Sequence, residues 1–414
     1  MHVLLIGSGG REHALAWKIA RSPRLSRLLS VPGNPGTGSF GQNVPFPLND
    51  FEALVDLAQR ERIDLVVIGP DNPLAEGIVD AFVAAGIPAF GPSAAAARIE
   101  SSKAFAKEIM AAAGVPTAAT HVFSTPAEAD AFARTSGQPW VVKADGLALG
   151  KGVVVPDDLP ATLAAIAQLG ATPAGSRLLL EERLSGREVS VLALCDGQRL
   201  LPLPPARDHK RLWAGDTGPN TGGMGVVAPL DEVSAALLDQ IVATCMQPVV
   251  DELAARGAPF RGVLYAGIML TPTGPQVLEF NARFGDPEAQ AILPLLDGDF
   301  LEVLYDCAVG SLHPEKLRRR KGYAVCVVLC AEGYPGKPRK GDPIRGVEAL
   351  DDQQVLVFHA GTSIGPTGLC TAGGRVLGVT GLGPTLARAR ARAYEAVERI
   401  RFAGKHYRDD IGKE

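Results

Sequence analysis

The chain has few cysteines and no long basic or apolar run. Its six cysteines stand without CxxC spacing, which argues against a zinc ribbon, and a chain of 414 residues does not need disulfides to fold. We therefore expect reduced thiols in the core at Cys195, Cys245, Cys307, Cys326, Cys330 and Cys370. The N-terminal apolar run HVLLIG is far too short for a signal peptide or a membrane span. A cytoplasmic protein is expected.

Charge and size limit the function classes further. With 41 Lys and Arg against 45 Asp and Glu, the net charge is −4, and no basic run is present. Nucleic acid and anionic membranes are therefore not expected as partners. The chain is too long for one core and should divide into two to four domains. It contains neither an internal repeat nor a low-complexity tail.

The first hundred residues alternate strand-like runs, glycine-rich turns and helical segments. The apolar runs at 2–7 and 63–69 each end in glycine, and predicted helices follow at 11–21 and 75–85. Repeated strand, turn and helix is the pattern of a doubly wound parallel sheet, in which ligands bind at the carboxyl ends of the strands. We expect such a domain at the N-terminus.

The pattern changes after residue 115. Strand-like 139–146 and 151–156 flank a glycine turn and predict an antiparallel hairpin, followed by a helix at 158–169. From about residue 321 the sequence reads as short antiparallel strands, and the helix at 385–400 closes the chain. The expected fold is a multidomain α/β and α+β protein with a small mixed α/β domain at the C-terminus.

The segment 208–225, DHKRLWAGDTGPNTGGMG, is the most informative in the chain. Five glycines in its last eleven residues predict a loop, because helices and strands tolerate such a composition poorly. Charges of both signs, among them Asp208 and Lys210, stand beside the glycines. These features favour a loop that closes on a polar, charged small molecule.

Two other segments suit a nucleotide. In VVKADGLALGKGVVV (141–155), Lys143 leaves a strand before a glycine turn whose N–H groups could cradle phosphates, although the spacing is not that of a P-loop. In LLLEERLSGREVS (178–190), paired glutamates end a strand, and Glu188 could accept from ribose hydroxyls. The alternatives are an ordinary hairpin with an exposed lysine and a strand with solvated carboxylates.

The segment VLEFNARFGDPEAQ (277–290) suits a metal ion. Glu279, Asn281 and Arg283 alternate with apolar residues, so a strand would place all three on one face. Carboxylate and amide oxygens suit Mg²⁺, and Arg283 could hold a carboxylate or a phosphoryl oxygen. The alternative is a simple edge strand that faces solvent.

These segments together resemble a known family. Lys103, Lys143, EERL (181–184) and EFNARF (279–284) follow the order and approximate spacing of the ATP-grasp ligases. With the glycine-rich segment, the chain closely resembles the phosphoribosylamine–glycine ligases over essentially its whole length. The other matching segments are GSGGREHALAWKIARSP (7–23), PGN (32–34), FNARFGDPEAQ (280–290), VFHAGT (357–362), GGRVL (373–377) and RDDIG (408–412).

The resemblance implies an ATP-dependent ligase of purine biosynthesis. The family joins glycine to 5-phosphoribosylamine through glycyl phosphate, with ATP as co-substrate and Mg²⁺ or Mn²⁺ as the metal, and releases ADP and phosphate. The implied domains are an N-terminal domain at 1–102, an ATP-grasp region at 103–315 with a mobile flap at about 118–188, and a C-terminal domain at 322–414. A monomer acting on small molecules is expected.

The resemblance also assigns residues. The ATP contacts are Lys103, Lys143, Gly146, Gly150, Gly152, Glu181, Glu182, Leu184 and Glu188. The metal ligands are Glu279 and Asn281, and the catalytic candidates are Arg283, Lys143, Asp208 and Lys210. The substrate contacts are Gly9, Gly10, Arg11, Glu12, Asn34, Asp71, Asp208, Asn220, Thr221, Gly222, Gly223, Met224, Gly225 and Arg283. The family often has glutamate at the position of Asp71.

The glycine loop 7–10 allows a second interpretation. It precedes a helix N-terminus, a natural anion site, and could belong to a Rossmann dinucleotide fold. The third glycine of that motif would fall at Glu12, and PGN rather than an acidic residue follows the second strand. We therefore favour the sugar phosphate of phosphoribosylamine over NAD. His13 and His209 are expected to form hydrogen bonds rather than to act as catalysts.

Three other functions compete with the favoured one. A different ATP-grasp ligase would differ in its substrate loop, where GPNTGGMG favours the glycine enzyme. A nicotinamide-dependent oxidoreductase would need the missing glycine. A non-catalytic nucleotide-binding module would be expected to have lost Glu279, Asn281 or Lys143, and all three are present.

Overall fold

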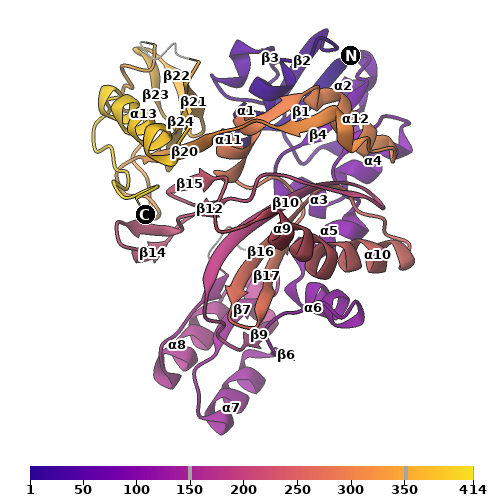
Figure 1. The fold of residues 1–414 in the computed structure, drawn as a ribbon, viewed down its shortest axis with the longest axis vertical. Coiled ribbons are helices and arrows are strands. Elements are labelled where there is room, and N and C mark those ends of the chain that lie inside the picture. Colours follow the sequence, from indigo (N-terminus) through magenta and orange to yellow (C-terminus); the bar gives the residue numbers. More distant parts are fainter. Residues whose placement is uncertain (148–151, 349–352, 414) are drawn as a thin grey trace.

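The computed structural model describes residues 1–147, 152–348 and 353–413. It begins with a five-stranded parallel sheet in the order β3–β2–β1–β4–β5 (Figure 1). The strands are β1 His2–Gly7, β2 Arg27–Pro32, β3 Gln42–Asn43, β4 Leu65–Ile68 and β5 Ala89–Phe90. The helices are α1 Gly10–Ile19, α2 Phe51–Arg60, α3 Asp71–Ala75, α4 Ile78–Ala84 and α5 Ala94–Ser101. The predicted parallel sheet is confirmed.

One predicted helix of this region begins later than expected. The helix predicted over 75–85 is observed as α4, Ile78–Ala84, and Gly77 separates it from the short helix α3. Gly77 has φ +93°, a left-handed conformation that residues with a Cβ adopt only at a steric cost. Two residues separate the short helix α3 from β4, so Asp71 lies in the first turn of the helix.

A small lobe, residues 120–181, follows helix α6 (Lys103–Ala112). Its antiparallel sheet has the order β6–β9–β7–β8, which confirms the predicted hairpin. The strands are β6 Thr120–Phe123, β7 Val141–Ala144, β8 Val153–Val154 and β9 Leu178–Glu181, and the helices are α7 Pro126–Ser136 and α8 Leu159–Gly170. In Figure 1 the lobe projects from the rest of the molecule at the end opposite the N-terminal sheet.

A second antiparallel sheet lies between the lobe and the N-terminal sheet, in the order β11–β10–β16–β17 (Figure 1). Its strands are β10 Arg187–Asp196, β11 Leu200–Pro202, β16 Arg261–Thr271 and β17 Gly274–Asn281. The helices of this region are α9 Ala235–Ile241, α10 Gln247–Ala255, α11 Glu288–Ile292 and α12 Phe300–Val309. A short ribbon pairs β18 Leu296–Gly298 with β19 Leu317–Arg319. Strand β17, which carries Glu279 and Asn281, forms one edge of the sheet.

The C-terminal strands are antiparallel, as predicted, but their sheet also recruits the middle of the chain. Its order is β12–β15–β20–β24–β21. The strands are β12 Arg207–Asp208, β15 Gly225–Ala228, β20 Tyr323–Cys330, β21 Val355–His359 and β24 Arg375–Gly383. Strands β22 Thr362–Gly365 and β23 Gly368–Thr371 form a hairpin, and α13 Leu386–Arg399 packs on the sheet.

The glycine-rich segment is therefore only partly a loop, and the prediction is corrected. Its ends are the strands β12 and β15, and a hairpin of β13 Arg211–Trp213 and β14 Thr217–Asn220 stands between them. Gly218, with φ +81°, packs under the Trp213 ring, where a Cβ would lie 2.8 Å from a ring carbon. The glycine that argues against a strand thus makes room for a side chain of the same hairpin.

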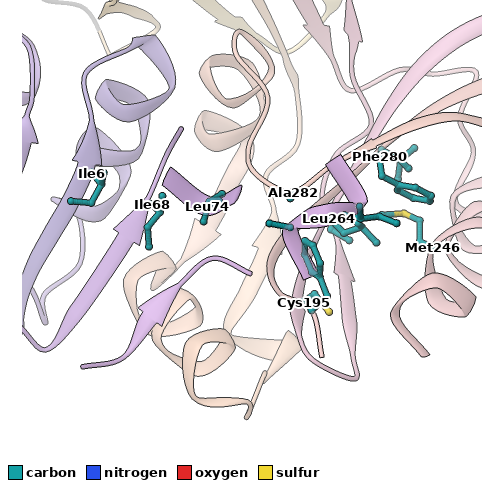
Figure 2. Packing of buried hydrophobic residues seen from close by; sticks show 14 of the residues in the cluster. Ile6, Ile68, Leu74, Cys195, Met246, Leu264, Phe280 and Ala282 are labelled. Carbon is teal, nitrogen blue, oxygen red and sulfur yellow. The ribbon is translucent and has the colours of Figure 1, made fainter. Parts of the chain in front are cut away.

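Two large apolar clusters run through the main part of the molecule. Figure 2 shows how one of them extends from Ile6 and Ile68 of the N-terminal sheet, past Leu74, to Leu264 and Phe280 of the central sheet. The small lobe has a separate cluster of its own. All six cysteines are buried and free, as predicted. Among the described residues, none of the helices has the length and apolar character needed to cross a membrane.

Candidate active site

The site is centred on the edge strand β17 and the residues after it. Phe280 and Ala282 are buried, and between them the Asn281 amide oxygen accepts from Arg283 Nη2 at 3.2 Å. Arg283 also pairs with Glu100 of α5, with 2.8 Å between Nη2 and Oε1. These contacts fix Arg283 beside Asn281, and the strand end is a packed polar site rather than a solvent-facing edge.

Glu279 lies among four cationic side chains that sequence analysis selected separately. Burial alone would raise the pKa of Glu279, but Lys210, Lys143, Lys103 and Arg283 lower it below the usual range. Within residues 1–147, 152–348 and 353–413, its carboxylate has no hydrogen-bond or ion-pair partner. Glu279 is therefore a carboxylate with free lone pairs in a strongly positive setting.

Lys103 and Lys143 approach this strand from two sides. Lys143 Nζ, at the end of β7, donates to Leu278 O at 2.9 Å and pairs with Glu181 Oε2 at 2.8 Å. Lys103 Nζ, at the start of α6, donates to Gly146 O at 3.0 Å. Lys143 is only 5% exposed, which rules out an ordinary hairpin with an exposed lysine.

Glu181 is also buried rather than solvated. Its Oε2 pairs with Lys143 and, at 3.2 Å, with Lys107 of α6, a residue that sequence analysis missed. Its Oε1 is buried without a partner in the described part of the chain. Burial, partly offset by Glu181, lowers the pKa of Lys107 to about 8. Lys107 stands on a helix without a motif of its own, so the sequence gives no signal for its role.

The other predicted ATP residues have varied settings. Glu182 is exposed, Leu184 is half-buried and Gly152 is buried. Gly146 supplies the carbonyl that Lys103 contacts. Gly150 lies outside the described residues.

Glu188 and Lys210 form an ion pair across the site, with 2.6 Å between Oε1 and Nζ. Partial removal from water disfavours the charge on Lys210, but Glu188, and then Tyr265 and Glu279, raise its pKa well above the usual value. Lys210 therefore remains a cation. The proposed contact of Glu188 with ribose stays a prediction.

Asp208 carries an unpartnered carboxylate oxygen. Its Oδ1 atom is buried and has no hydrogen-bond partner among the described residues. Burial, and then the neighbouring Glu288, raise the pKa of Asp208 well above its ordinary value. Glu288, which sequence analysis also missed, accepts a hydrogen bond from Tyr265 Oη at 2.6 Å. Two buried carboxyl groups near one another suit a cationic ligand group.

The other predicted substrate residues of the glycine-rich segment have different settings. Thr221, Gly222 and Gly223 turn over Asp208, and a Cβ on Gly223 would lie 2.6 Å from Asp208 Oδ1. Asn220 is exposed on the β14 strand, and Met224 packs into an apolar cluster with Leu212, Val328 and Cys330. Gly225 begins β15 and lies against Cys326 of the next strand.

The N-terminal loop is held by carboxylates. Glu12 accepts from the Gly9 N–H at 2.5 Å and from Arg11 Nε at 2.6 Å, and Asp286 faces the Arg11 N–H at 3.5 Å. Gly10 packs against Gln290, where a Cβ would lie 2.5 Å from its amide nitrogen. A phosphate bound here would have to replace a carboxylate at these N–H groups.

Asn34 organises this loop. Its amide nitrogen donates to Ser8 O at 2.8 Å and to His359 O at 2.9 Å, and its amide oxygen accepts from the Gly36 and Thr37 N–H groups. Its side-chain polar atoms are thus engaged within the protein, and the predicted sugar contact stays a prediction.

Asp71 and the two histidines complete the comparison with the predicted set. Asp71 lies near Arg283: burial alone would lower the pKa of that guanidinium, but Glu100 and then Asp71 raise it above its usual value. His13 Nδ1 accepts from the His359 N–H at 2.7 Å, and His209 Nδ1 contacts Gly225 O at 3.2 Å. Both histidines form hydrogen bonds, as expected.

The donors present fit a divalent metal only when substrate oxygens complete the set. No group of three or more His, Cys, Asp or Glu side chains that could hold a metal occurs among the described residues. Glu279 supplies a free carboxylate, and Asn281 supplies an amide oxygen beside it. Mg²⁺ commonly takes one or two protein ligands and binds phosphates and water at the other positions, which matches this pair.

The fold and the site together define a class. After an N-terminal parallel sheet, an antiparallel lobe with a buried lysine lies beside a sheet whose edge strand carries a carboxylate and an amide and is followed by an arginine. This is the architecture of an ATP-grasp enzyme.

Comparison with family models gives the particular family. Residues 1–100, 101–289 and 324–414 match the phosphoribosylglycinamide synthetase N domain, ATP-grasp (A) domain and C domain. The chain belongs to the phosphoribosylglycinamide synthetase family and is an ATP-grasp ligase.

Curated relatives and a solved structure agree. The chain is 49% identical to phosphoribosylamine–glycine ligase of Synechocystis sp., over 100% of this chain and 99% of that protein. It is also 49% identical to the enzyme of the same name from Caulobacter vibrioides, over 99% and 97%. The crystal structure of phosphoribosylamine–glycine ligase from Thermotoga maritima matches with a TM-score of 0.85 at 34% identity, over 99% of this chain and 100% of that chain.

More distant structures share the fold alone. A biotin carboxylase from Campylobacter jejuni, solved as a complex with β,γ-ATP, has a TM-score of 0.73 at 15% identity and covers 98% of this chain.

Proposed function

We propose that the protein joins glycine to 5-phosphoribosylamine with ATP, giving glycinamide ribonucleotide, ADP and phosphate, as a step of purine biosynthesis. The observation that carries the proposal is the convergence of Lys103, Lys143, Lys210 and Arg283 on the free carboxylate of Glu279. Such a cluster suits a reaction in which a phosphoryl group with several negative charges is transferred.

The chemistry needs two steps. A glycine carboxylate oxygen attacks the γ-phosphorus, the bond from phosphorus to the ADP oxygen breaks, and glycyl phosphate forms. The ribosylamine nitrogen then attacks the acyl carbon, phosphate leaves with the electrons of the C–O bond, and the nitrogen loses a proton. Phosphorylation is required because oxide is too poor a leaving group for direct amide formation.

The two lysines at the joint between the lobe and the central sheet would hold the ATP phosphates. Lys143 is fixed by Leu278 O and Glu181, and Lys103 by Gly146 O, so both are oriented before nucleotide binds. Glu279 and Asn281 would hold Mg²⁺, which neutralises negative charge on the phosphates when bound; Mn²⁺ would suit the same oxygen donors.

Glycine would bind between Arg283 and Asp208. Arg283 would hold the glycine carboxylate or the acyl phosphate with its planar fork, and Asp208 Oδ1 would accept from the glycine ammonium. An ammonium beside Asp208 also restores the charge of a carboxyl group that otherwise favours its neutral form. Lys210 would stay a cation near the transferred group.

We further propose the domain division 1–102, 103–315 and 322–414, with a flap at about 118–188 that closes on ATP and excludes water from the acyl phosphate. The separate apolar cluster of the small lobe supports this flap. We also propose that the protein is a cytoplasmic monomer.

The test is ADP release by the purified protein with ATP, Mg²⁺, glycine and freshly made phosphoribosylamine, omitting each in turn. ADP formation should require both glycine and the ribosylamine. Unchanged ADP formation without glycine, or with another carboxylate in its place, would overturn the substrate but not the ATP-grasp chemistry. A fluorescence titration with NAD, expected to show no binding, tests the oxidoreductase alternative.

A further inference from the structure

Two residues from the C-terminal sheet region hold the main chain of Gly222. The Gly222 N–H donates to Tyr334 Oη at 2.8 Å, and its carbonyl accepts from Arg375 Nη1. Tyr334 follows β20, and Arg375 is the first residue of β24. Both main-chain polar groups of Gly222 are thus satisfied by side chains more than a hundred positions further along the chain.

The position of Gly222 determines how the segment covers Asp208. A Cβ on Gly222 would lie 3.0 Å from the central carbon of the Arg375 guanidinium, so the contact depends on glycine. Gly223 follows with φ +112° and lies directly against the Asp208 carboxylate. Movement of Gly222 would therefore move the main chain that packs against the Asp208 carboxylate.

The same guanidinium extends to a second segment. Arg375 Nη1 also donates to Asp286 O at 2.6 Å, and Nη2 lies 3.5 Å from Asp286 Oδ2. The Asp286 carboxylate accepts from Gln290 Nε2 at 2.8 Å and faces the Arg11 N–H at 3.5 Å. One side chain therefore connects the turn over Asp208 with the N-terminal loop.

We propose that Arg375 is a positioning residue that sets the turn at Gly222–Gly223 and the loop at Gly9–Arg11 relative to one another, with Tyr334 as its partner on the turn alone. The inference rests on the proposed function, in which these segments bind glycine and phosphoribosylamine. Arg375 does not touch the ATP groups Lys103 and Lys143, so its effect is confined to the two smaller substrates.

Arginine is required because the contacts diverge. Arg375 donates from one nitrogen to two carbonyl oxygens and places a second nitrogen toward a carboxylate. A planar guanidinium presents several donors in a fixed fork, whereas a lysine ammonium is a single point charge. Arg375→Lys would keep the positive charge near Asp286 and lose the bridge.

The decisive experiment measures KM for all three substrates in Arg375→Met and Arg375→Lys. Removing charge-assisted hydrogen bonds of this kind should raise KM for glycine and for phosphoribosylamine by roughly tenfold or more, and leave KM for ATP within about twofold. Tyr334→Phe removes the acceptor for the Gly222 N–H and the hydroxyl contact with the Thr221 side chain, both within the turn. It should raise KM for glycine severalfold and leave KM for phosphoribosylamine unchanged.

Arg392→Met is the matched control. Arg392 lies on α13 over the same sheet and also donates to a main-chain carbonyl, Leu382 O at 2.6 Å. It should leave all three KM values unchanged. An equal rise in all three values for Arg375→Lys would indicate a general structural role and overturn the proposal, as would unchanged glycine KM. If the wild-type protein released ADP without glycine, the proposed function itself would fall.

Discussion

The small lobe and the rest of the molecule are built in opposite ways. The lobe encloses its own apolar cluster, which includes Trp140, Ile166 and Leu180. Elsewhere one cluster unites residues from Ile6 to Ile411, so that segments from both ends of the chain share one core. A unit with its own core can move as a body, whereas the shared core binds the other regions to each other.

The joint between these two parts is polar. Lys143 of the lobe donates to Leu278 O, Lys103 of α6 donates to Gly146 O, and Lys107 of α6 pairs with Glu181. The lobe carboxylate Asp145 accepts from the Ala104 N–H at 3.1 Å. The residues proposed to bind ATP are therefore those that connect the lobe to α6 and β17. Nucleotide binding and lobe position should be coupled, because the same groups serve both.

The largest effect is expected for Glu279, the proposed metal ligand on β17. Glu279→Ala should reduce turnover by about a thousandfold or more, because the phosphoryl transfer loses a charge-neutralising group. ATP binding should weaken much less, since Lys103 and Lys143 remain. Steady-state ADP release and calorimetric ATP binding measure the two quantities separately.

The control for this variant is Asp239→Ala, an exposed position on α9. It should leave both quantities unchanged. A near-normal rate of Glu279→Ala at saturating Mg²⁺ would contradict the assignment of Glu279 as a metal ligand.

A pair of isoleucines tests the difference between the two cores directly. Ile166→Ala in the lobe and Ile268→Ala in the central sheet each remove a buried side chain and should cost about 2–5 kcal/mol. In Ile166→Ala the increase in amide hydrogen exchange over the wild type should be confined to residues 120–181. In Ile268→Ala it should spread across the sheets outside the lobe. Equal acceleration of both regions in Ile166→Ala would show that the cores are not independent.

Substitution of Asp208 should affect KM for glycine but not KM for ATP. Asp208→Asn removes the charge that faces the glycine ammonium and should raise KM for glycine by roughly tenfold or more, with little change in KM for ATP. Initial rates at varied glycine and varied ATP measure this split. Equal effects on both KM values would reject Asp208 as a glycine contact.

In the absence of substrates, Asp208→Asn should be more stable than the wild-type protein. The pKa of Asp208 is raised by folding, so above its unfolded pKa the native state binds more protons than the unfolded state. The free energy of unfolding then falls as pH rises toward the native pKa. Asp208→Asn removes this loss, and its Tm at neutral pH should exceed that of the wild type. A lower Tm would contradict the raised pKa.

The smallest expected effect is on the pH profile of ATP binding. The Lys107 pKa is lowered to about 8, so raising the pH through that value removes the positive charge paired with Glu181. KM for ATP should rise with pH over this interval by up to about tenfold, the change that corresponds to one unit of pKa. Lys107→Arg, which stays charged, should flatten the profile. A profile identical in the two proteins would separate Lys107 from the ATP site.

Elements with local signals were predicted well. The alternation of β1 and β4 with glycines and helices, the β7–β8 hairpin, and the alternate positions of Glu279 and Asn281 on the edge strand follow from short-range periodicity. Arg283, predicted on the same strand, lies two residues beyond its end. The conversion of the two ends of the glycine-rich segment into sheet strands did not follow, because β15 pairs with β20, about a hundred residues later, and β12 pairs with β15. Local patterns in a single sequence do not indicate which distant strands will pair.

The missed site residues have the same cause. Lys107 lies outside the segments that carry the resemblance, on helix α6. Glu288 and Arg375 lie within two of those segments, FNARFGDPEAQ and GGRVL, but the sequence assigned them no role. Each becomes important through a partner from a distant segment: Glu181 for Lys107, Tyr265 for Glu288, and Gly222 for Arg375.

The sequence by itself determined which chemical groups are available and on which short elements they stand: lysines before turns, a carboxylate and an amide at alternate positions of a strand, and glycines where the main chain must approach a side chain. The tertiary structure decided their charge and accessibility. It buried Lys143 against Glu181, surrounded Glu279 with cations and left Asp208 Oδ1 without a hydrogen-bond partner in the part of the chain that the structure describes. The physical reason is that desolvation and Coulomb interactions depend on neighbours in space, and folding alone brings those neighbours together.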